Sequence, residues 1–288
     1  MTYHPIPVEN TPLDRAQIAR VLVTAHHAHP YLPAAYSFNP LPVLIENSRL
    51  RLGSNLLKPK GWFMKILAKE VEDGDSDGDS GSAHTHKSQT FGDGELKSGV
   101  LDKQHQKGVE KSDGNGEIIV SYAKWEVPLD LKEKLEKEYP RAKLSETELA
   151  ELDADRRKGC DANGEPKGMN EELIEEVGAQ MEEARQAFPN HRPHMSLDLL
   201  ATLPSCQRRG LGTAHVEWGL KLADREGLLV FLESTPSGVN LYKKLGFKEV
   251  SSSTHDLTKW GGDGLFTHVF MMREPEKVQR EAEAMVQG

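Results

Sequence analysis

The stretch MSLDLLATLPSCQRRGLGT, residues 195–213, decides the fold of this chain. Its first half is apolar enough to predict a buried strand over residues 197–203. Two glycines, Gly210 and Gly212, then lie beside two arginines in a turn that precedes a helical pattern. A strand, a glycine-rich turn and a helix in this order place backbone N–H groups and a helix N-terminus around an anion. The stretch therefore predicts an anion-binding turn.

The segment after this turn continues as alternating helices and strands. We expect a helix over residues 213–226 that ends at Gly227 in the left-handed conformation, followed by a buried strand over residues 228–232. We also expect a short helix over residues 240–245 and two strands, over residues 248–253 and 266–272. The pattern predicts a chain that mixes helices and strands around one sheet.

Two common nucleotide-binding motifs do not fit the turn. No Gly-Lys-Ser or Gly-Lys-Thr is present at the glycines, which excludes a P-loop. The third glycine of the dinucleotide fingerprint would fall at His215, so that motif fails as well. The predicted anion is therefore held by some other kind of glycine-rich turn.

The turn resembles the pyrophosphate-binding motif of the GNAT superfamily, the acetyl-CoA-dependent N-acetyltransferases. Residues 207–212 match Gln/Arg-x-x-Gly-x-Gly/Ala, and residues 241–247, LYKKLGF, are similar to the family's L-Y-x-x-x-G-F signature. The resemblance is specific over residues 195–250, the expected acetyl-CoA-binding core. It implies a single α/β (mixed α+β) domain over residues 1–288, with a central, mostly antiparallel twisted sheet, a splayed parallel strand pair and flanking helices.

The resemblance makes acetyl-CoA the expected co-substrate, with its pantetheine between two splayed strands at residues 197–203 and 229–233. In the family, backbone amides of the turn hold the pyrophosphate, and a backbone N–H of the first strand polarises the thioester carbonyl. Many members carry an asparagine where this chain has Thr235, which leaves that contact open. The residues expected to contact the cofactor are Leu203, Gln207, Arg208, Arg209, Gly210, Leu211, Gly212, Thr213, Ser234, Asn240 and Tyr242.

The chemistry implied by the resemblance is direct attack of a primary amine on the thioester in a ternary complex. Tyr242 matches the family's tyrosine and is the expected general acid, although an aromatic residue packed on the sheet fits the same position. Glu233, at the end of a buried strand, is the expected general base, because desolvation makes a carboxylate a stronger proton acceptor. A carboxylate held by backbone N–H groups fits Glu233 equally well. Asp198, His194 and a chain of waters are the alternative bases.

The acceptor is predicted to be a small-molecule amine, because the long helical segment before residue 195 suggests a walled pocket. A protein lysine or N-terminus is the alternative acceptor. A hypothesis of a different class is a CoA-binding or interaction protein whose acetyl transfer has decayed. The presence of Gly210, Gly212 and Tyr242 argues against that hypothesis.

Composition and charge limit the partners. The chain has 288 residues, with 36 Lys and Arg against 45 Asp and Glu, so its formal net charge is −9. This balance disfavours nucleic acid and anionic membranes as partners and favours the steering of cationic amines. We see no membrane-spanning apolar run or signal peptide, and the two cysteines, Cys160 and Cys206, do not make a disulfide scaffold. We expect a cytoplasmic protein, and a homodimer is left open.

Outside the core, a helix is predicted over residues 12–27, strands over residues 62–70 and 118–125, and a helical insertion over residues 129–190. The polar residues 71–116 between the two strands predict an acidic, low-complexity surface insertion. No metal site is predicted at the histidines His26, His27 and His29, because no further ligands converge there.

A calcium loop is the alternative interpretation of one part of that insertion. Asp73, Asp75 and Asp77 match its first ligand positions, but its twelfth position, which requires a glutamate, is His84. A solvated acidic loop is therefore favoured over a calcium site.

Overall fold

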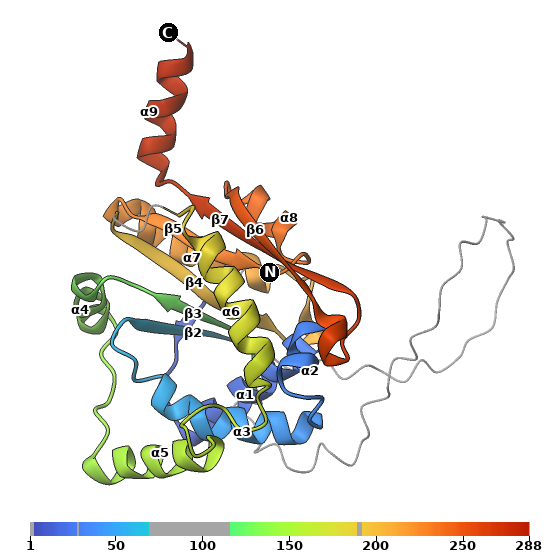
Figure 1. Cartoon of the computed structure of the whole chain (residues 1–288). Coiled ribbons are helices and arrows are strands. Elements are labelled where there is room, and N and C mark those ends of the chain that lie inside the picture. The colour runs from blue at the N-terminus through green and yellow to red at the C-terminus, as the bar shows by residue number, and fades with distance from the viewer. Residues whose placement is uncertain (1–2, 28, 69–115, 189–191, 288) are drawn as a thin grey trace, which may run out of the picture.

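The computed structural model describes residues 3–27, 29–68, 116–188 and 192–287. Within these residues seven strands form one sheet in the order β1-β2-β3-β4-β5-β7-β6 (Figure 1). The strands are β1 (Ile6–Pro7), β2 (Gly61–Ala68), β3 (Ile118–Glu126), β4 (His194–Thr202), β5 (Leu229–Ser234), β6 (Lys248–Asp256) and β7 (Leu265–Arg273). The α-helices are α1 (Pro12–His27), α2 (Tyr31–Ala35), α3 (Leu41–Asn55), α4 (Leu129–Glu138), α5 (Glu146–Gly159), α6 (Glu171–Arg185), α7 (Leu211–Glu226), α8 (Val239–Lys244) and α9 (Glu276–Gln287).

The sheet is antiparallel except for one parallel pair, β4 and β5. These strands pair from His194 opposite Leu229 to Leu197 opposite Leu232, and then they diverge. Beyond this point β4 keeps its pairing with β3, and β5 keeps its pairing with β7. The mixed α/β class and the splayed parallel pair predicted from the sequence are confirmed.

A β-bulge on β4 lies where the two strands diverge. Trp125 of β3 pairs with Leu197 and Lys124 pairs with Leu199, so Asp198 is the extra residue between them. A bulge bends its strand and re-aims a side chain. The bulge therefore places Asp198 beside the gap between β4 and β5.

One face of the sheet is covered by α4, α7 and α8. Alternation along β3 puts Ala123 and Trp125 on this face, where they join one buried cluster with Val216 and Leu220 of α7. Gly219 lets α7 approach β3 closely, because a Cβ at this position would collide with the indole ring of Trp125. The close approach sets the position of the turn that begins α7.

The opposite face carries α1 and α3 over the first strands and α6 over β5 and β7 (Figure 1). Ile18 and Val21 of α1 belong to one buried cluster with Tyr122 of β3. Phe231 of β5 and Phe270 of β7 pack against the apolar side of α6. The two faces of the β4–β5 junction are therefore covered by different helices, α7 and α6.

The helical segment expected over residues 129–190 consists of three separate helices. A capping box between Ser145 and Glu148 begins α5, and the Asn170 side chain caps α6. Leu173 and Val177 of α6 are buried. Of the three helices, α6 lies over the end of β5.

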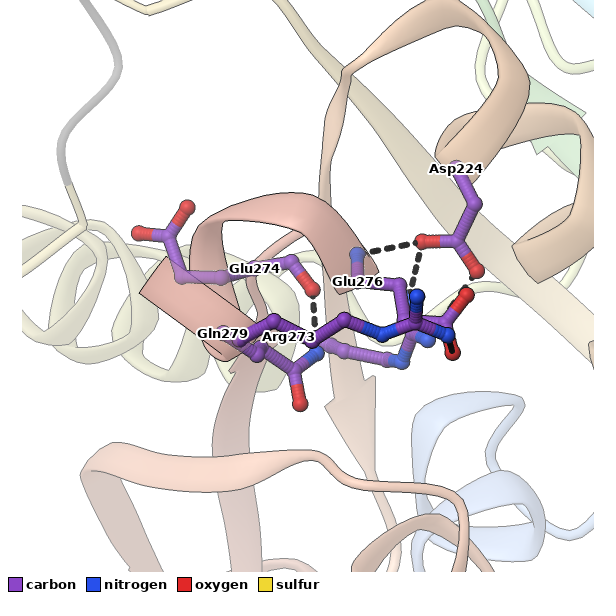
Figure 2. A network of polar contacts seen from close by, with 6 residues as sticks. Asp224, Arg273, Glu274, Glu276 and Gln279 are labelled. Carbon is purple, nitrogen blue, oxygen red and sulfur yellow. Dashed lines mark hydrogen bonds and ion pairs between the residues drawn. The ribbon is translucent and has the colours of Figure 1, made fainter. Parts of the chain in front are cut away.

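Four elements were not predicted from the sequence: β1, α2, α3 and α9. The start of α9 is attached to α7 by a polar network (Figure 2), in which Arg273 pairs with Asp224 at 2.8 Å and the Glu276 backbone N–H donates to the same carboxylate at 2.8 Å. The Gln279 amide donates to the Glu274 carbonyl oxygen. From this attachment α9 extends away from the sheet (Figure 1).

The predicted acidic insertion lies outside the described residues, apart from Gly116, and so do Asp73, Asp75 and Asp77. In the described part of the chain, no helix is long and apolar enough to cross a membrane. The same residues contain no group of three or more His, Cys, Asp and Glu side chains that could hold a metal ion. At the end of α1, His26 Nδ1 lies 2.7 Å from the Leu22 carbonyl oxygen.

Candidate active site

After β4 the chain makes a single 3₁₀ turn, η2 (Pro204–Cys206). Residues 207–213, here named the glycine turn, follow η2 and lead into α7. The Gln207 side-chain amide donates to the Thr202 carbonyl oxygen at 3.2 Å, which ties the turn back to the strand. Gly210 is the N-cap of α7 with φ = 87°, and Arg208 also has a positive φ of 61°. The turn thus reverses the chain sharply and aims the start of α7 at the end of β4.

The start of α7 has the properties of an anion site. The first N–H groups of a helix have no partner within it and carry the positive end of its dipole. A Cβ on Gly210 would meet nothing within 4 Å, so the space beside this residue is open. Arg208 and Arg209 are exposed next to it. Glycine is required at position 210 by its positive φ, because side-chain-bearing residues rarely adopt it.

The end of β5 and the helix α8 form the other wall of this site. A Cβ on Gly212 of the turn would lie 3.5 Å from the Leu241 side chain, so α8 packs against the start of α7. Ser234 is buried, and its hydroxyl donates to the Thr235 carbonyl oxygen at 2.7 Å. Asn240 is exposed on α8.

Tyr242 of α8 is buried close to the end of β5. Its ring makes an edge contact with Phe247, with centroids 5.7 Å apart, and a Cβ on Gly238 would lie 2.9 Å from it. Burial raises the pKa of Tyr242 to about 12, so its hydroxyl keeps its proton at neutral pH. The side chain is thus packed as an aromatic residue and is also able to donate a proton.

Most of the predicted cofactor contacts lie around this site. The glycine turn, Ser234 and Tyr242 come together although they are far apart in the sequence. Leu203 lies in the core, where its backbone N–H donates to the Val120 carbonyl oxygen at 2.9 Å. The Thr235 hydroxyl, at the position where the family has an asparagine, makes a 2.9 Å hydrogen bond with Ser237.

On the opposite face of the β4–β5 junction lies a cavity of about 530 Å³, here named the α6 cavity. It contains the predicted base, Glu233, and both alternatives, Asp198 and His194. Side chains from β3, β4, β5 and α6 therefore meet at one place. The residues that line it are Glu126, Glu182, Arg185, Gln186, Phe188, His194, Ser196, Leu197, Asp198, Phe231, Leu232 and Glu233.

The two carboxylates nearest the strand divergence are both ion-paired. Arg185 Nε lies 2.5 Å from Glu233 Oε1, and Lys124 Nζ lies 2.6 Å from Asp198 Oδ2. The hydrogen bond that Arg185 donates to Glu233 raises the pKa of Arg185 above its usual value. Arg185 was not predicted from the sequence, because no motif around it indicates its partner on β5.

His194 is oriented by its neighbours on the cavity wall. Its Nδ1 lies 2.9 Å from the Arg192 carbonyl oxygen, which can only accept, so Nδ1 carries the proton. A second cavity of about 300 Å³ shares Glu126, His194 and Ser196 with the first. The two hollows therefore join along the start of β4.

A partly buried chain of hydrogen-bonded side chains connects α6 to the sheet beside the α6 cavity. His255 Nδ1 lies 2.7 Å from Gln180 Oε1 of α6, and His255 Nε2 lies 3.1 Å from His268 Nδ1. Burial lowers the pKa of His268 to about 4 and lowers that of His255 as well. Both imidazoles are therefore neutral at neutral pH.

Comparisons with known proteins agree with the geometry at the glycine turn. Residues 129–247 match the model described as the acetyltransferase (GNAT) family. A curated protein of Ajellomyces capsulatus, named "Probable acyltransferase SID5", is 40% identical over 45 residues, which are 16% of this chain. The match spans 33%, about a third, of that relative's length.

Among solved structures, the "histone acetyltransferase HPA2 and related acetyltransferase" of Corynebacterium glutamicum is 18% identical, with a TM-score of 0.46, covering 96% of this chain and 97% of that one. The ribosomal-protein-S18-alanine N-acetyltransferase of Escherichia coli is 12% identical, with a TM-score of 0.39, covering 95% and 94%. Likenesses at this level say nothing about what this chain acts on.

The glycine turn lies on one side of the splayed parallel pair, and a polar cavity lies on the other. The family match over residues 129–247 lies across both the turn and the parallel pair. Residues 129–247 therefore resemble the GNAT acetyltransferase family, a family of acyltransferase enzymes.

Proposed function

We propose that the chain transfers the acetyl group of acetyl-CoA to a primary amine by direct attack in a ternary complex. One observation carries this proposal: β4 and β5 diverge between an anion-binding turn on the α7 face and a carboxylate-lined cavity on the α6 face. A thioester placed in the gap would be open to cofactor on one side and to acceptor on the other. The family match supports the same arrangement.

The residues present fit the cofactor. The first N–H groups of α7, the open space at Gly210 and the exposed arginines Arg208 and Arg209 suit a pyrophosphate. Bound acetyl-CoA would supply the activated acetyl group as a thioester. Ser234 and Tyr242 lie at the end of β5, where the pantetheine arm would pass.

The chain's own groups would move the protons. An alkylammonium has a pKa near 10, so its deprotonation costs about 4 kcal/mol at pH 7 unless a base assists. Glu233 lies on the wall of the α6 cavity and is the proposed proton acceptor, with Asp198 on the neighbouring strand. Tyr242 is the proposed donor to the leaving thiolate, because it is buried and protonated.

The acceptor is proposed to be a small amine. The α6 cavity of about 530 Å³ is walled by α6 on one side and by strands on the other, which suits a small molecule more than a folded protein surface. A cytoplasmic location and a homodimer remain predictions from the sequence.

Thermal unfolding with and without acetyl-CoA tests the cofactor site. We expect acetyl-CoA to raise the melting temperature of the wild-type protein by several degrees. Gly210→Asp should abolish this rise, because it places a carboxylate in the anion site. The matched control is Gly227→Asp at the other end of α7, where φ is 67° and a Cβ also meets nothing within 4 Å.

The control should be destabilised to a similar degree while keeping the response to acetyl-CoA. If a folded wild-type protein shows no response, or if both variants lose it equally, the turn is not a cofactor site. A wild-type response is then followed by acetylation of an amine panel, monitored by release of free CoA thiol.

A further inference from the structure

Arg185 is placed where a positively charged acceptor would be expected. It is the last residue of α6, and its guanidinium lies against Glu233 in the wall of the α6 cavity. Glu233 has 24% of its side chain exposed, and Arg185 has 42%. The carboxylate beside the strand divergence therefore already holds a cation, and this cation is on a side chain that reaches solvent.

Arg185 has a second partner on its own helix. Its Nη1 lies 3.2 Å from Glu182 Oε2, one turn earlier, and the Glu182 side chain is 69% exposed. Residues three apart are neighbours on a helix surface. The guanidinium can therefore leave Glu233 and keep an ion pair with Glu182 by a change of its side-chain rotamer.

The charges on the cavity wall are unequal. Among the lining residues that the structure describes, four carry carboxylates, and Arg185 is the cation. Lys60 and Lys124 pair with Glu126 and Asp198 from outside this lining. Glu182 and Glu233 share the single guanidinium of Arg185, so one negative charge at this wall is not balanced.

We propose that Arg185 is a gate that takes the place of the acceptor's ammonium on Glu233. This rests on the proposed function. A cationic amine displaces the guanidinium, which moves to Glu182, and the ammonium then lies on Glu233. An acceptor with an acid group near its amine is rejected, since the wall holds a surplus of carboxylates. The substrate class is therefore an amine without a neighbouring carboxylate or phosphate.

The displacement would also prepare the proton transfer. A carboxylate that has lost its guanidinium partner is a stronger proton acceptor than one that keeps it. Glu233 takes one proton from the ammonium and later releases it to solvent. The neutral amine forms the C–N bond and the C–S bond breaks. The thiolate takes the Tyr242 proton, and the new amide nitrogen returns its surplus proton to Tyr242 through solvent.

Three variants test the gate with n-butylamine and 4-aminobutanoate as acceptors. Arg185→Gln should lower KM for n-butylamine about three- to tenfold, because the competing cation is gone. Glu182→Gln should raise that KM, because the displaced guanidinium has no partner. The double variant should behave like Arg185→Gln alone. Mere structural damage would not lower KM.

Glu176→Gln is the matched control for Glu182→Gln. It removes a carboxylate from the same helix, and with it the 2.8 Å ion pair to Lys259, but Glu176 does not line the α6 cavity. Its KM for n-butylamine should equal that of the wild-type protein. A second measurement does not need turnover: calorimetric binding of n-butylamine to the CoA-bound protein should also tighten about three- to tenfold in Arg185→Gln.

The outcomes separate the gate from the proposed function. A higher KM and weaker binding of n-butylamine in Arg185→Gln overturn the gate, as does a wild-type preference for 4-aminobutanoate. If the wild-type protein acetylates neither amine, the proposed function is refuted for simple amines, and the calorimetric comparison decides the gate by itself. A KM that rises in Glu176→Gln as much as in Glu182→Gln also overturns it.

Discussion

The two faces of the β4–β5 junction are built in different ways. On the α7 face, the glycine turn is a contiguous segment whose anion site consists of backbone N–H groups and a positive φ at Gly210. On the α6 face, the cavity wall consists of side chains from β3, β4, β5 and α6. One face depends on main-chain geometry, and the other depends on the balance of side-chain charges.

This difference teaches which part of such a protein is free to vary. Backbone donors bind the same pyrophosphate whatever side chains surround them, provided that the turn keeps its shape. A wall of charged side chains can be changed one residue at a time, and each change alters the preferred acceptor. Arg185 belongs to the second kind, since it lies on α6, which packs against β5 and β7.

The largest expected effect concerns the proposed proton donor on the α7 face. Tyr242→Phe should lower kcat about 100-fold, the usual size for loss of a general acid. It should leave the rise in melting temperature with acetyl-CoA unchanged, because the ring still packs on Phe247. Because burial raises the pKa of Tyr242 to about 12, the wild-type rate should show no loss of this acid between pH 7 and pH 9.

Tyr139→Phe is the control for this change. Tyr139 packs on Trp62 with ring centroids 6.2 Å apart and has no part in the site. Steady-state kinetics should give it the wild-type kcat. An equal loss of kcat in both variants would contradict the proposed role of Tyr242 as proton donor.

A smaller effect is expected from pH, because the α7 face contains a buried imidazole. His215 of α7 is fully buried, and neither ring nitrogen makes a well-formed hydrogen bond in the described structure. Burial lowers the pKa of His215 to about 3. The unfolded chain binds a proton below a pH of about 6.5 and the folded chain does not, so stability falls as the pH falls from about 6.5 towards 3.

From this residue alone, the free energy of unfolding should be about 2 kcal/mol lower at pH 5 than at pH 7. Urea denaturation at both pH values measures the difference. His215→Leu should remove most of this contribution, whereas His27→Gln, at an exposed residue, should not. If the pH dependence of stability is unchanged in His215→Leu, burial of a neutral His215 is not its cause.

The smallest effect tests whether backbone shape alone governs the glycine turn. Gly210→Ala should lower the free energy of unfolding by about 1 kcal/mol, because alanine is strained at φ = 87°. Gly212→Ala should leave it unchanged or raise it slightly, since its Cβ would make ordinary contacts of 3.5 and 3.6 Å inside the helix. Urea unfolding of the two variants without cofactor provides the measurement, and equal losses would contradict the assignment.

Much of the α7 face could be predicted because its signals are local. Gly227 ends α7 with φ = 67°, as the sequence indicated. The resemblance to the GNAT superfamily implied the parallel pair, and the structure confirms it. These features depend on residues within one or two turns of each other, so a single sequence is sufficient to find them.

The charge arrangement at Glu233 could not be predicted in the same way. Its location at the end of a buried strand indicated a desolvated carboxylate, but the structure pairs it with Arg185, 48 residues earlier. Lys124 and Asp198 are likewise 74 residues apart. An ion pair depends on which helix lies over which strand, and no local pattern around either residue records that.

Local features of the sequence were enough to indicate the family resemblance, the glycine turn and the candidate proton donor, because backbone conformation and helix ends are set by neighbouring residues. Which charges share the α6 cavity, and which cation Glu233 holds, became visible in the folded structure alone. The physical reason is range: φ preferences and caps act over a few residues, whereas Coulomb interactions between side chains follow distances that exist only after the sheet and its helices have packed.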